Sequence, residues 1–219
     1  MKSKFGSVSI VKSGKIGKNL IILDFDGVIA DTHGLSMSIL AKLFPTLSIK
    51  AFEESLSGIY SISPFRRLLR WIYSQYFLFE YARLLKPSML FPDARLLLKE
   101  LSASGTVLVL TSGRRAPVQK FLAATGLLEE ITEVVGLSTS SKRVGLRNLT
   151  MRYGCDTNCC LFVSDTIGDL REASEEGIKT IGAGWGYQGS KTLREGGVYP
   201  VVDFPSEVLN AMAQLRGAV

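Results

Sequence analysis

One stretch near the start of the chain limits both its fold and its chemistry. Residues 20–27 read Leu-Ile-Ile-Leu-Asp-Phe-Asp-Gly, so four apolar residues run directly into two acidic residues separated by one position. A short apolar run that ends at polar residues and glycine is typical of a strand buried on both faces of a parallel sheet. The sequence therefore predicts an internal strand at 20–23, with Asp24 and Asp26 at its carboxyl end.

Similar apolar runs recur along the chain and alternate with helical patterns. Each helical pattern is followed by a glycine, the residue that often ends a helix. The alternation predicts an α/β protein with a doubly wound parallel sheet and right-handed crossovers. The further expected strands are 107–110, 161–163 and 178–181, and the expected helices are 94–103, 115–125, 142–153 and 167–176.

One segment interrupts this alternation. Residues 32–91 contain helical patterns and no convincing buried strand, which predicts an α-helical domain inserted into the core. An amphipathic pattern begins at Pro64, and Pro87 and Pro92 mark the return to the core. The predicted organisation is an N-terminal extension at 1–18, an α/β core made of 19–31 and 92–219, and a helical insertion at 32–91.

Composition narrows the class of protein. The 219 residues are 46% hydrophobic and 21% charged, as in a folded globular protein. No apolar run approaches the ~18 residues of a membrane span, and the basic N-terminus lacks the apolar region of a secretory signal, so we expect a cytoplasmic protein without a membrane partner. The net charge of +6 alone fits nucleic acid, an acidic surface or a small anionic substrate. Because no basic run interleaved with aromatic residues marks a nucleic-acid module, we expect no nucleic-acid partner.

The three cysteines, Cys155, Cys159 and Cys160, are too few and too close together for a disulfide framework. The only histidine, His33, lies far from them in the sequence, which disfavours a zinc site. We interpret the cysteines as buried thiols near a strand.

Polar residues follow the expected strands at the points where they end. Because the carboxyl ends of parallel strands meet at one edge of a sheet, where ligands bind, these residues are expected to lie close together. Several carboxylates at one edge repel each other unless a cation joins them, and hard oxygen ligands favour Mg²⁺. The candidate residues are Asp24, Asp26, Thr111, Ser112, Gly113, Lys142, Asp165 and Asp169.

Other interpretations of these residues are available. Asp24 and Asp26 resemble the start of a calcium-binding loop, but an EF-hand requires Glu at its twelfth position and Leu35 stands there. Asp169 by itself fits an acidic residue interacting with a helix N-terminus. Residues 182–187, Gly-Ala-Gly-Trp-Gly-Tyr, match only the first glycines of a dinucleotide-binding motif, and we expect them to form a loop that lines the site.

Taken in order, these motifs resemble those of the haloacid dehalogenase superfamily, in its phosphoglycolate phosphatase-like branch. The family's first motif, an apolar strand followed by Asp-x-Asp-Gly, matches residues 20–27. Its second motif, a strand ending in Thr or Ser, matches 106–111, and its fourth matches Val-Ser-Asp-Thr-Ile-Gly-Asp at 163–169. The resemblance covers nearly the whole chain after residue 18 and implies a Rossmann-like core with a cap domain.

The resemblance also implies a role for each residue. Asp24 is the expected nucleophile, and Asp26 is the expected general acid and base. Mg²⁺ is expected at the Asp24 carboxylate, the Asp26 carbonyl and Asp165, with Asp169 binding directly or through water. The expected phosphate-binding groups are Thr111, Ser112, Gly113 and Lys142. The neighbouring Arg143 and Arg147 are alternatives to Lys142, because the Lys-Pro that often marks this motif is Lys-Arg here. We prefer Lys142 because, like the family's lysine, it precedes the helix that leads into the Asp165 strand.

The implied activity is hydrolysis of a small phosphorylated metabolite through an aspartyl-phosphate. The alternatives are a sugar-phosphate mutase of the β-phosphoglucomutase type, a phosphonatase-like or dehalogenase-like relative, and a binding protein that has lost catalysis. In the inserted segment, Arg66, Arg67 and Arg70 are candidates for a second anionic group of the substrate, or lie on a solvated helix face. The aromatic residues that follow them fit a cap core or a subunit interface, which leaves a homodimer open.

Overall fold

The computed structural model describes residues 19–43, 64–137 and 141–217; the side chains of 64–71 and 216 lie outside this description. The expected N-terminal extension at 1–18 also lies outside it. Among the described residues, no helix has both the length and the apolar character needed to cross a membrane.

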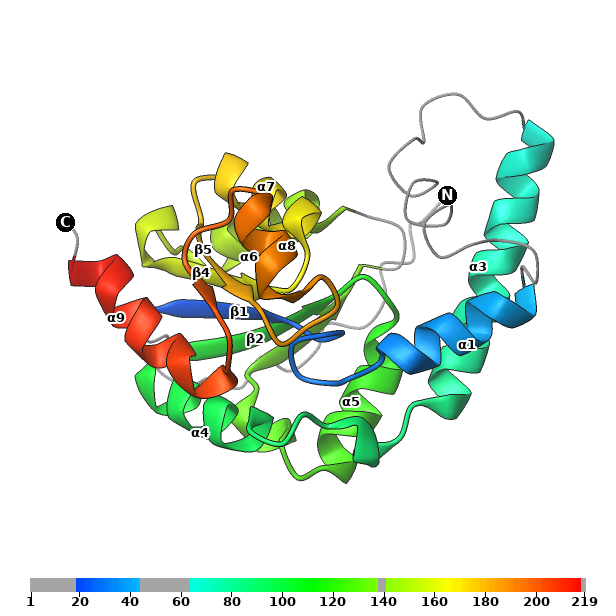
Figure 1. The fold of residues 1–219 in the computed structure, drawn as a ribbon, viewed down its shortest axis with the longest axis horizontal. Coiled ribbons are helices and arrows are strands. Elements are labelled where there is room, and N and C mark those ends of the chain that lie inside the picture. Colours follow the sequence, from blue (N-terminus) through cyan, green and yellow to red (C-terminus); the bar gives the residue numbers. More distant parts are fainter. Residues whose placement is uncertain (1–18, 44–63, 138–140, 218–219) are drawn as a thin grey trace, which may run out of the picture.

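The described strands form one sheet in the order β3-β2-β1-β4-β5-β6, and every neighbouring pair is parallel. Figure 1 shows this sheet with helices on both sides, which confirms the predicted doubly wound α/β fold. β1 lies in the middle, with Asp24 paired in register to Leu110 of β2. The strands are β1 (Leu20–Asp24), β2 (Thr106–Thr111), β3 (Glu133–Gly136), β4 (Cys160–Ser164), β5 (Lys179–Ala183) and β6 (Val201–Val202).

The four expected core helices are present, and their bounds agree with the prediction to within one residue. The α-helices are α1 (His33–Leu43), α3 (Pro64–Leu84), α4 (Ala94–Ser104), α5 (Arg115–Ala124), α6 (Lys142–Tyr153), α7 (Ile167–Glu175), α8 (Gly189–Glu195) and α9 (Val208–Gly217). Short 3₁₀ helices connect them: η1 (Pro87–Met89), η2 (Leu128–Glu130), η3 (Thr157–Cys159) and η4 (Pro205–Glu207).

Alternation of side chains along β1 builds the two halves of the core. Ile21 and Leu23 pack on one face of the sheet, against a cluster that includes residues of α4, α5 and α9. Leu20 and Ile22 pack on the other face, against residues of α6, α7 and α8. Because successive residues of a strand point to opposite faces, an unbroken apolar run is what a doubly covered central strand requires.

The sequence did not predict two strands and two helices. In β3 only Val134 is buried, and β6 has two residues, so neither carries an apolar run long enough to recognise. The helices that were missed, α8 and α9, lie late in the chain, and α8 spans only seven residues. β3 and β6 form the two edges of the sheet, and α8 and α9 pack on its faces. The predicted positions of the carboxyl ends of β1, β2 and β4 are not affected.

The described part of the inserted segment is helical. Figure 1 shows α1 and α3 packed together beyond the carboxyl ends of the central strands. Their contact contains Leu35, Ile39 and Tyr81, with Phe77 and Met89 packed against them. η1 begins at Pro87, where the sequence places the return to the core. The division of the chain into core and cap at residues 31 and 92 stays a prediction.

The cysteines only partly follow the expectation of buried thiols. Cys160 begins β4 and is buried, whereas Cys155 is half-buried and Cys159 is exposed at the end of η3. Burial raises the pKa of the Cys160 thiol well above its usual range. The described residues contain no group of three or more His, Cys, Asp or Glu side chains arranged to hold a metal ion, and the interpretation against zinc stays a prediction.

A pair of glycine substitutions tests the backbone of this fold. Gly154 follows α6 with φ of 58° and a left-handed conformation, so Gly154→Ala should lower the free energy of unfolding by about 1–2 kcal/mol. Gly34, in the first turn of α1, has open space where a Cβ would stand, so Gly34→Ala should raise it by about 0.4–1 kcal/mol. Urea denaturation of both variants measures this, and equal effects of the two would contradict the assigned backbone.

Candidate active site

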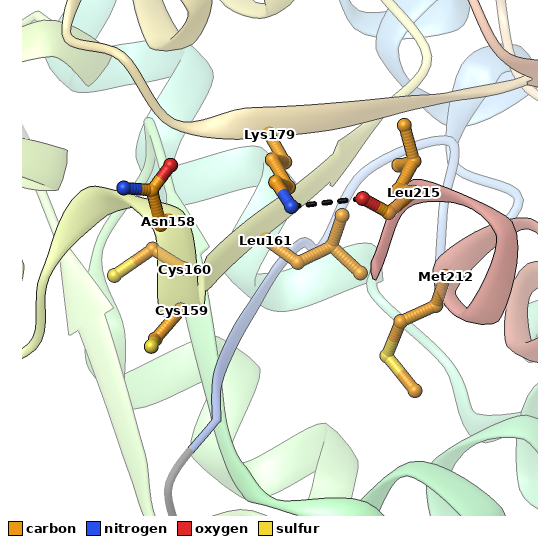
Figure 2. A pocket seen from close by; sticks show the side chains of 7 residues that line it. All are labelled: Asn158, Cys159, Cys160, Leu161, Lys179, Met212 and Leu215. Carbon is orange, nitrogen blue, oxygen red and sulfur yellow. Dashed lines mark hydrogen bonds between the residues drawn. The ribbon is translucent and has the colours of Figure 1, made fainter. Parts of the chain in front are cut away.

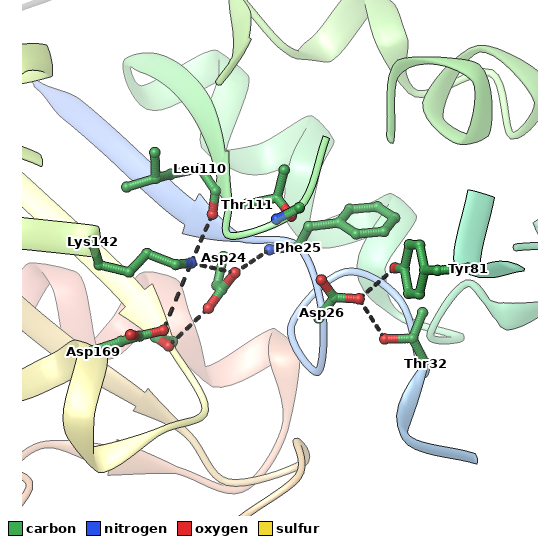
Figure 3. Close-up of polar contacts among 11 residues, drawn as sticks. Asp24, Phe25, Asp26, Thr32, Tyr81, Leu110, Thr111, Lys142 and Asp169 are labelled. Atoms are coloured by element: carbon green, nitrogen blue, oxygen red, sulfur yellow. Dashed lines mark hydrogen bonds and ion pairs between the residues drawn. The ribbon is translucent and has the colours of Figure 1, made fainter. Parts of the chain in front are cut away.

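The carboxylate of Asp24 lies at the end of the central strand and is almost fully buried, with 6% of the residue exposed. Its Oδ1 lies 2.6 Å from the Lys142 ammonium and accepts a hydrogen bond from the backbone N–H of Phe25 at 2.8 Å. Its Oδ2 accepts a hydrogen bond from the hydroxyl of Ser164 at 3.2 Å. The carboxylate is therefore held at both oxygens, in one orientation (Figure 3).

Lys142 is the cation that the structure brings to this carboxylate. It begins α6, only 4% of it is exposed, and its Nζ donates to the Leu110 carbonyl at 2.9 Å. Burial alone would lower the pKa of Lys142, but the negative charges of Asp24 and Asp169 outweigh it and raise that pKa, so the lysine is charged. The two competing residues lie elsewhere: Arg143 pairs with Glu175, and Arg147 pairs with Glu176 at 2.7 Å.

The loop that was expected to bind phosphate follows β2. Thr111 is buried, and its Oγ1 accepts a hydrogen bond from the backbone N–H of Gly113 at 3.1 Å. Ser112 is exposed, and α5 begins shortly afterwards at Arg115. Backbone N–H groups at the start of a helix favour anions, so the loop has the character that a phosphate site needs.

Two more carboxylates come from the end of β4 and the start of α7. Asp165 is 1% exposed, and its Oδ2 accepts a hydrogen bond from the backbone N–H of Tyr187 at 2.7 Å. Burial and then the negative charge of Asp24 raise the pKa of Asp165 to about 8. Burial likewise raises the pKa of Asp169 to about 7, although the Lys142 ammonium, 3.7 Å from its Oδ2, acts in the opposite direction.

These carboxylates fit a divalent cation by their chemistry. Burial is the main cause of both raised pKa values, and the negative charge of Asp24 adds to it. Space for Asp165 is provided by two glycines, because a Cβ at Gly27 or at Gly186 would collide with its side chain. The backbone at Gly27 therefore lies directly beside Asp165. The carboxylates of Asp24 and Asp165, the Asp26 carbonyl next to Gly27, and water are the kind of oxygen ligands that Mg²⁺ prefers.

Asp26 has a separate environment. Its half-buried side chain points away from Lys142 and toward α3, as Figure 3 shows. Its Oδ1 accepts hydrogen bonds from the hydroxyls of Thr32, at 2.6 Å, and of Tyr81. Burial raises the pKa of Asp26 above its ordinary value, and the two hydroxyls partly offset this. A carboxyl group with a raised pKa is suited to donate a proton near neutral pH.

The structure also places residues at the site that the sequence did not indicate. Thr32, Tyr81 and Ser164 contact the two catalytic candidates. Ser164 stands in the matched motif at 163–169 but was given no role, and Thr32 and Tyr81 were not singled out by any motif. Of residues 182–187, which were expected to form a loop, Gly182 and Ala183 instead end β5, whereas Tyr187 lies in the loop that follows and contacts Asp165. Of Arg66, Arg67 and Arg70, the structure describes only the backbone, in the first two turns of α3.

A pocket at the opposite edge of the sheet has a structural explanation. It lies by the amino ends of β4 and β5 and is lined by Asn158, Cys159, Cys160, Leu161, Lys179, Met212 and Leu215 (Figure 2). Within it, the Lys179 ammonium donates to the Leu215 carbonyl at 2.8 Å, near the end of α9. A lysine that bonds to a carbonyl in the last turn stabilises the helix end. The lysine in this pocket therefore already has a structural role.

Removal of the Asp165 carboxylate should raise the stability of the metal-free protein and abolish its stabilisation by Mg²⁺. The pKa of Asp165 is about 8 in the folded protein and about 4 in the unfolded chain. Without metal, the stability that this group contributes is therefore fully present below about pH 4 and is lost as the pH rises through about 8. At pH 8.5 without metal, Asp165→Asn should therefore unfold at a higher temperature than the parent. Added Mg²⁺ at 100 times its dissociation constant should stabilise the parent by about 2.7 kcal/mol and leave this variant unchanged.

Thermal unfolding with and without Mg²⁺ checks both parts. Asp203→Asn is the matched control, since Asp203 is half exposed and pairs with Arg194 at 2.9 Å on the surface. That variant should keep the full response to Mg²⁺. An unchanged response in Asp165→Asn would contradict the metal assignment.

Comparison with known proteins agrees with this geometry. Residues 21–183 match the family model described as haloacid dehalogenase-like hydrolase. A curated phosphoglycolate phosphatase from Synechococcus elongatus is 26% identical over 211 residues, which cover 89% of this chain and 97% of that protein. A haloacid dehalogenase-like hydrolase from Streptococcus pneumoniae has a similar structure, with a TM-score of 0.70, 20% identity, and coverage of 89% of this chain and 98% of that one. A predicted phosphoglycolate phosphatase from Haemophilus somnus, at 18% identity, gives a TM-score of 0.67 and coverage of 90% and 99%. The chain belongs to the haloacid dehalogenase-like hydrolases.

Proposed function

We propose that this hydrolase is a Mg²⁺-dependent phosphatase that cleaves a small phosphorylated metabolite through an aspartyl-phosphate at Asp24. The observation that carries the proposal is the different setting of two carboxylates two residues apart. Asp24 is fixed beside a buried ammonium group, and Asp26 faces two hydroxyl groups with its pKa raised. Different environments assign different roles to similar groups, so Asp24 is the nucleophile and Asp26 is the acid and base.

The reaction proceeds in two halves. An oxygen of the Asp24 carboxylate attacks phosphorus while the bond to the leaving oxygen breaks, and protonated Asp26 gives its proton to that oxygen. Asp26 then takes a proton from water, whose oxygen attacks the phosphorus of the aspartyl-phosphate. Cleavage of the bond between phosphorus and the Asp24 oxygen releases inorganic phosphate and restores both carboxyl groups.

The surrounding residues hold the negative charge of the transferring group. The Thr111 hydroxyl, the backbone N–H groups of Ser112 and Gly113, and the Lys142 ammonium are the proposed phosphate contacts. Asp24, Asp165 and the Asp26 carbonyl would hold Mg²⁺, with Asp169 a direct or water-mediated ligand. When bound, this cation reduces the repulsion between an anionic nucleophile and an anionic phosphate.

Phosphoglycolate is the first substrate to test, because a relative with that named activity matches nearly the whole chain. Such a substrate carries a carboxylate beyond its phosphate, and a basic side chain from the inserted helices is suited to bind it. Arg66, Arg67 and Arg70 at the start of α3 are the proposed candidates.

Substitution of the two carboxylates tests the assigned roles. Asp24→Asn should abolish phosphate release, because an amide is not a nucleophile of comparable strength. Asp26→Asn should lower kcat by about 10²–10⁴-fold on an alkyl phosphate, whose leaving oxygen needs a proton. Steady-state phosphate release in Mg²⁺ measures both, and Asp93→Asn, an exposed residue before α4, should match the parent.

Two outcomes would overturn the proposal. Undiminished phosphate release by Asp24→Asn would remove the nucleophile from the mechanism. Isomerisation of a sugar phosphate without net phosphate release, dependent on a bisphosphate activator, would identify a mutase instead.

A further inference from the structure

Three hydroxyl groups from distant parts of the chain gather around Asp26. Thr32 follows the turn after β1, Tyr81 lies near the end of α3, and Tyr187 lies in the loop after β5. The Thr32 and Tyr81 hydroxyls both bond to Asp26 Oδ1, and the Tyr187 hydroxyl bonds to that of Thr32. We call these three residues the hydroxyl cluster.

The direction of each hydrogen bond in the hydroxyl cluster follows from the number of protons available. A threonine hydroxyl has one proton, and Thr32 gives it to Asp26, so the Tyr187 hydroxyl must donate to Thr32. A tyrosine hydroxyl also has a single proton, and Tyr81 donates it to Asp26. Both donors reach the same oxygen, Oδ1, and these hydroxyls leave Oδ2 free to exchange a proton with substrate or water.

The ring of Tyr81 is held firmly in place by its neighbours. It is buried in the contact between α1 and α3, with Leu35 and Ile39, and it stacks on Phe77 with ring centroids 6.0 Å apart. Only 8% of Tyr81 is exposed. The ring therefore orients its hydroxyl without help from the hydrogen bond itself, so removing the oxygen alone leaves the packing intact.

The same side of α3 also contacts the phosphate-binding loop. Gln75 Oε1 accepts a hydrogen bond from Arg114 Nη2 at 2.5 Å, and Leu78 lies beside Gly113. Gln75, Leu78 and Tyr81 are spaced by three residues, which places them along one side of a helix. One helix thus meets both the loop after β2 and the carboxyl group of Asp26.

We propose that Tyr81 is a positioning residue, which acts through its hydrogen bond to Asp26 and holds Oδ2 of that carboxyl group toward the leaving oxygen. The inference rests on the proposed phosphatase activity and on the acid and base role of Asp26. Because Tyr81 belongs to α3 in the inserted segment, proton transfer by Asp26 then depends on the position of α3.

Substrates that differ in leaving group test the role of Tyr81. An alkyl phosphate such as phosphoglycolate needs a proton on its leaving oxygen, whereas para-nitrophenyl phosphate releases a stable anion. Because general acid catalysis contributes ~10²–10⁴-fold, Tyr81→Phe should lower kcat/KM, which reports formation of the aspartyl-phosphate, by about 10–100-fold on the alkyl phosphate and by less than about 3-fold on the aryl phosphate. Tyr76→Phe, which removes an exposed hydroxyl from the same helix, should match the parent on both.

Each result decides between a positioning and a merely structural role. The thermal shift that Mg²⁺ produces should be the same in Tyr81→Phe and the parent, because the substitution leaves the metal-binding carboxylates alone. An equal loss of kcat/KM on both substrates, an increase in kcat/KM, or no change in it would overturn the role of Tyr81 while leaving the phosphatase assignment standing. Absence of phosphate release by the parent protein would overturn the phosphatase assignment, and this inference with it.

Discussion

The buried ion pair between Lys142 and Asp24 is the interaction on which the rest of the site depends. A lone charge in the interior is costly, so each partner requires the other, and breaking such a pair leaves an uncompensated charge. Lys142 also bonds to the Leu110 carbonyl and lies near Asp169. One side chain thus joins the ends of β1 and β2 to α6 and α7, and holds the proposed nucleophile at the carboxyl edge of the sheet.

The turn after β1 separates the two acidic groups that this chemistry needs. Asp24 still belongs to the strand and faces the core, whereas Asp26 lies in the turn, next to Gly27 with φ of 71°. A residue with a Cβ at position 27 would be strained and would also collide with Asp165. One glycine therefore allows the turn and the close approach of a third carboxylate, and the electrostatics of the site follow from that crowding.

Much of this arrangement could be predicted because it depends on local patterns. An unbroken apolar run identifies a central strand, and the polar residues at its end or just after it are then candidate site residues, which is how Asp24, Thr111 and Asp165 were selected. β3 was not predicted because Val134 is its only buried residue and the others are partly exposed. β6 was not predicted because two residues are too few to form a recognisable pattern. Tyr81 could not be found, since its contact with Asp26 depends on how α3 packs across the sheet edge, and an aromatic residue in a helix usually fills a core. Lys142 was preferred over Arg143 and Arg147 from the sequence, because it stands ahead of the helix that leads into the Asp165 strand.

Direct detection of the aspartyl-phosphate tests the central claim most sharply. Asp26→Asn protein, mixed with para-nitrophenyl phosphate and Mg²⁺ and quenched in acid, should accumulate the intermediate, because loss of the general base slows its hydrolysis more than its formation from a good leaving group. Peptide mapping by mass spectrometry should then place one phosphoryl group on Asp24, labile to hydroxylamine. A phosphoryl group on another residue, or none in a variant that still releases nitrophenol, would contradict the account.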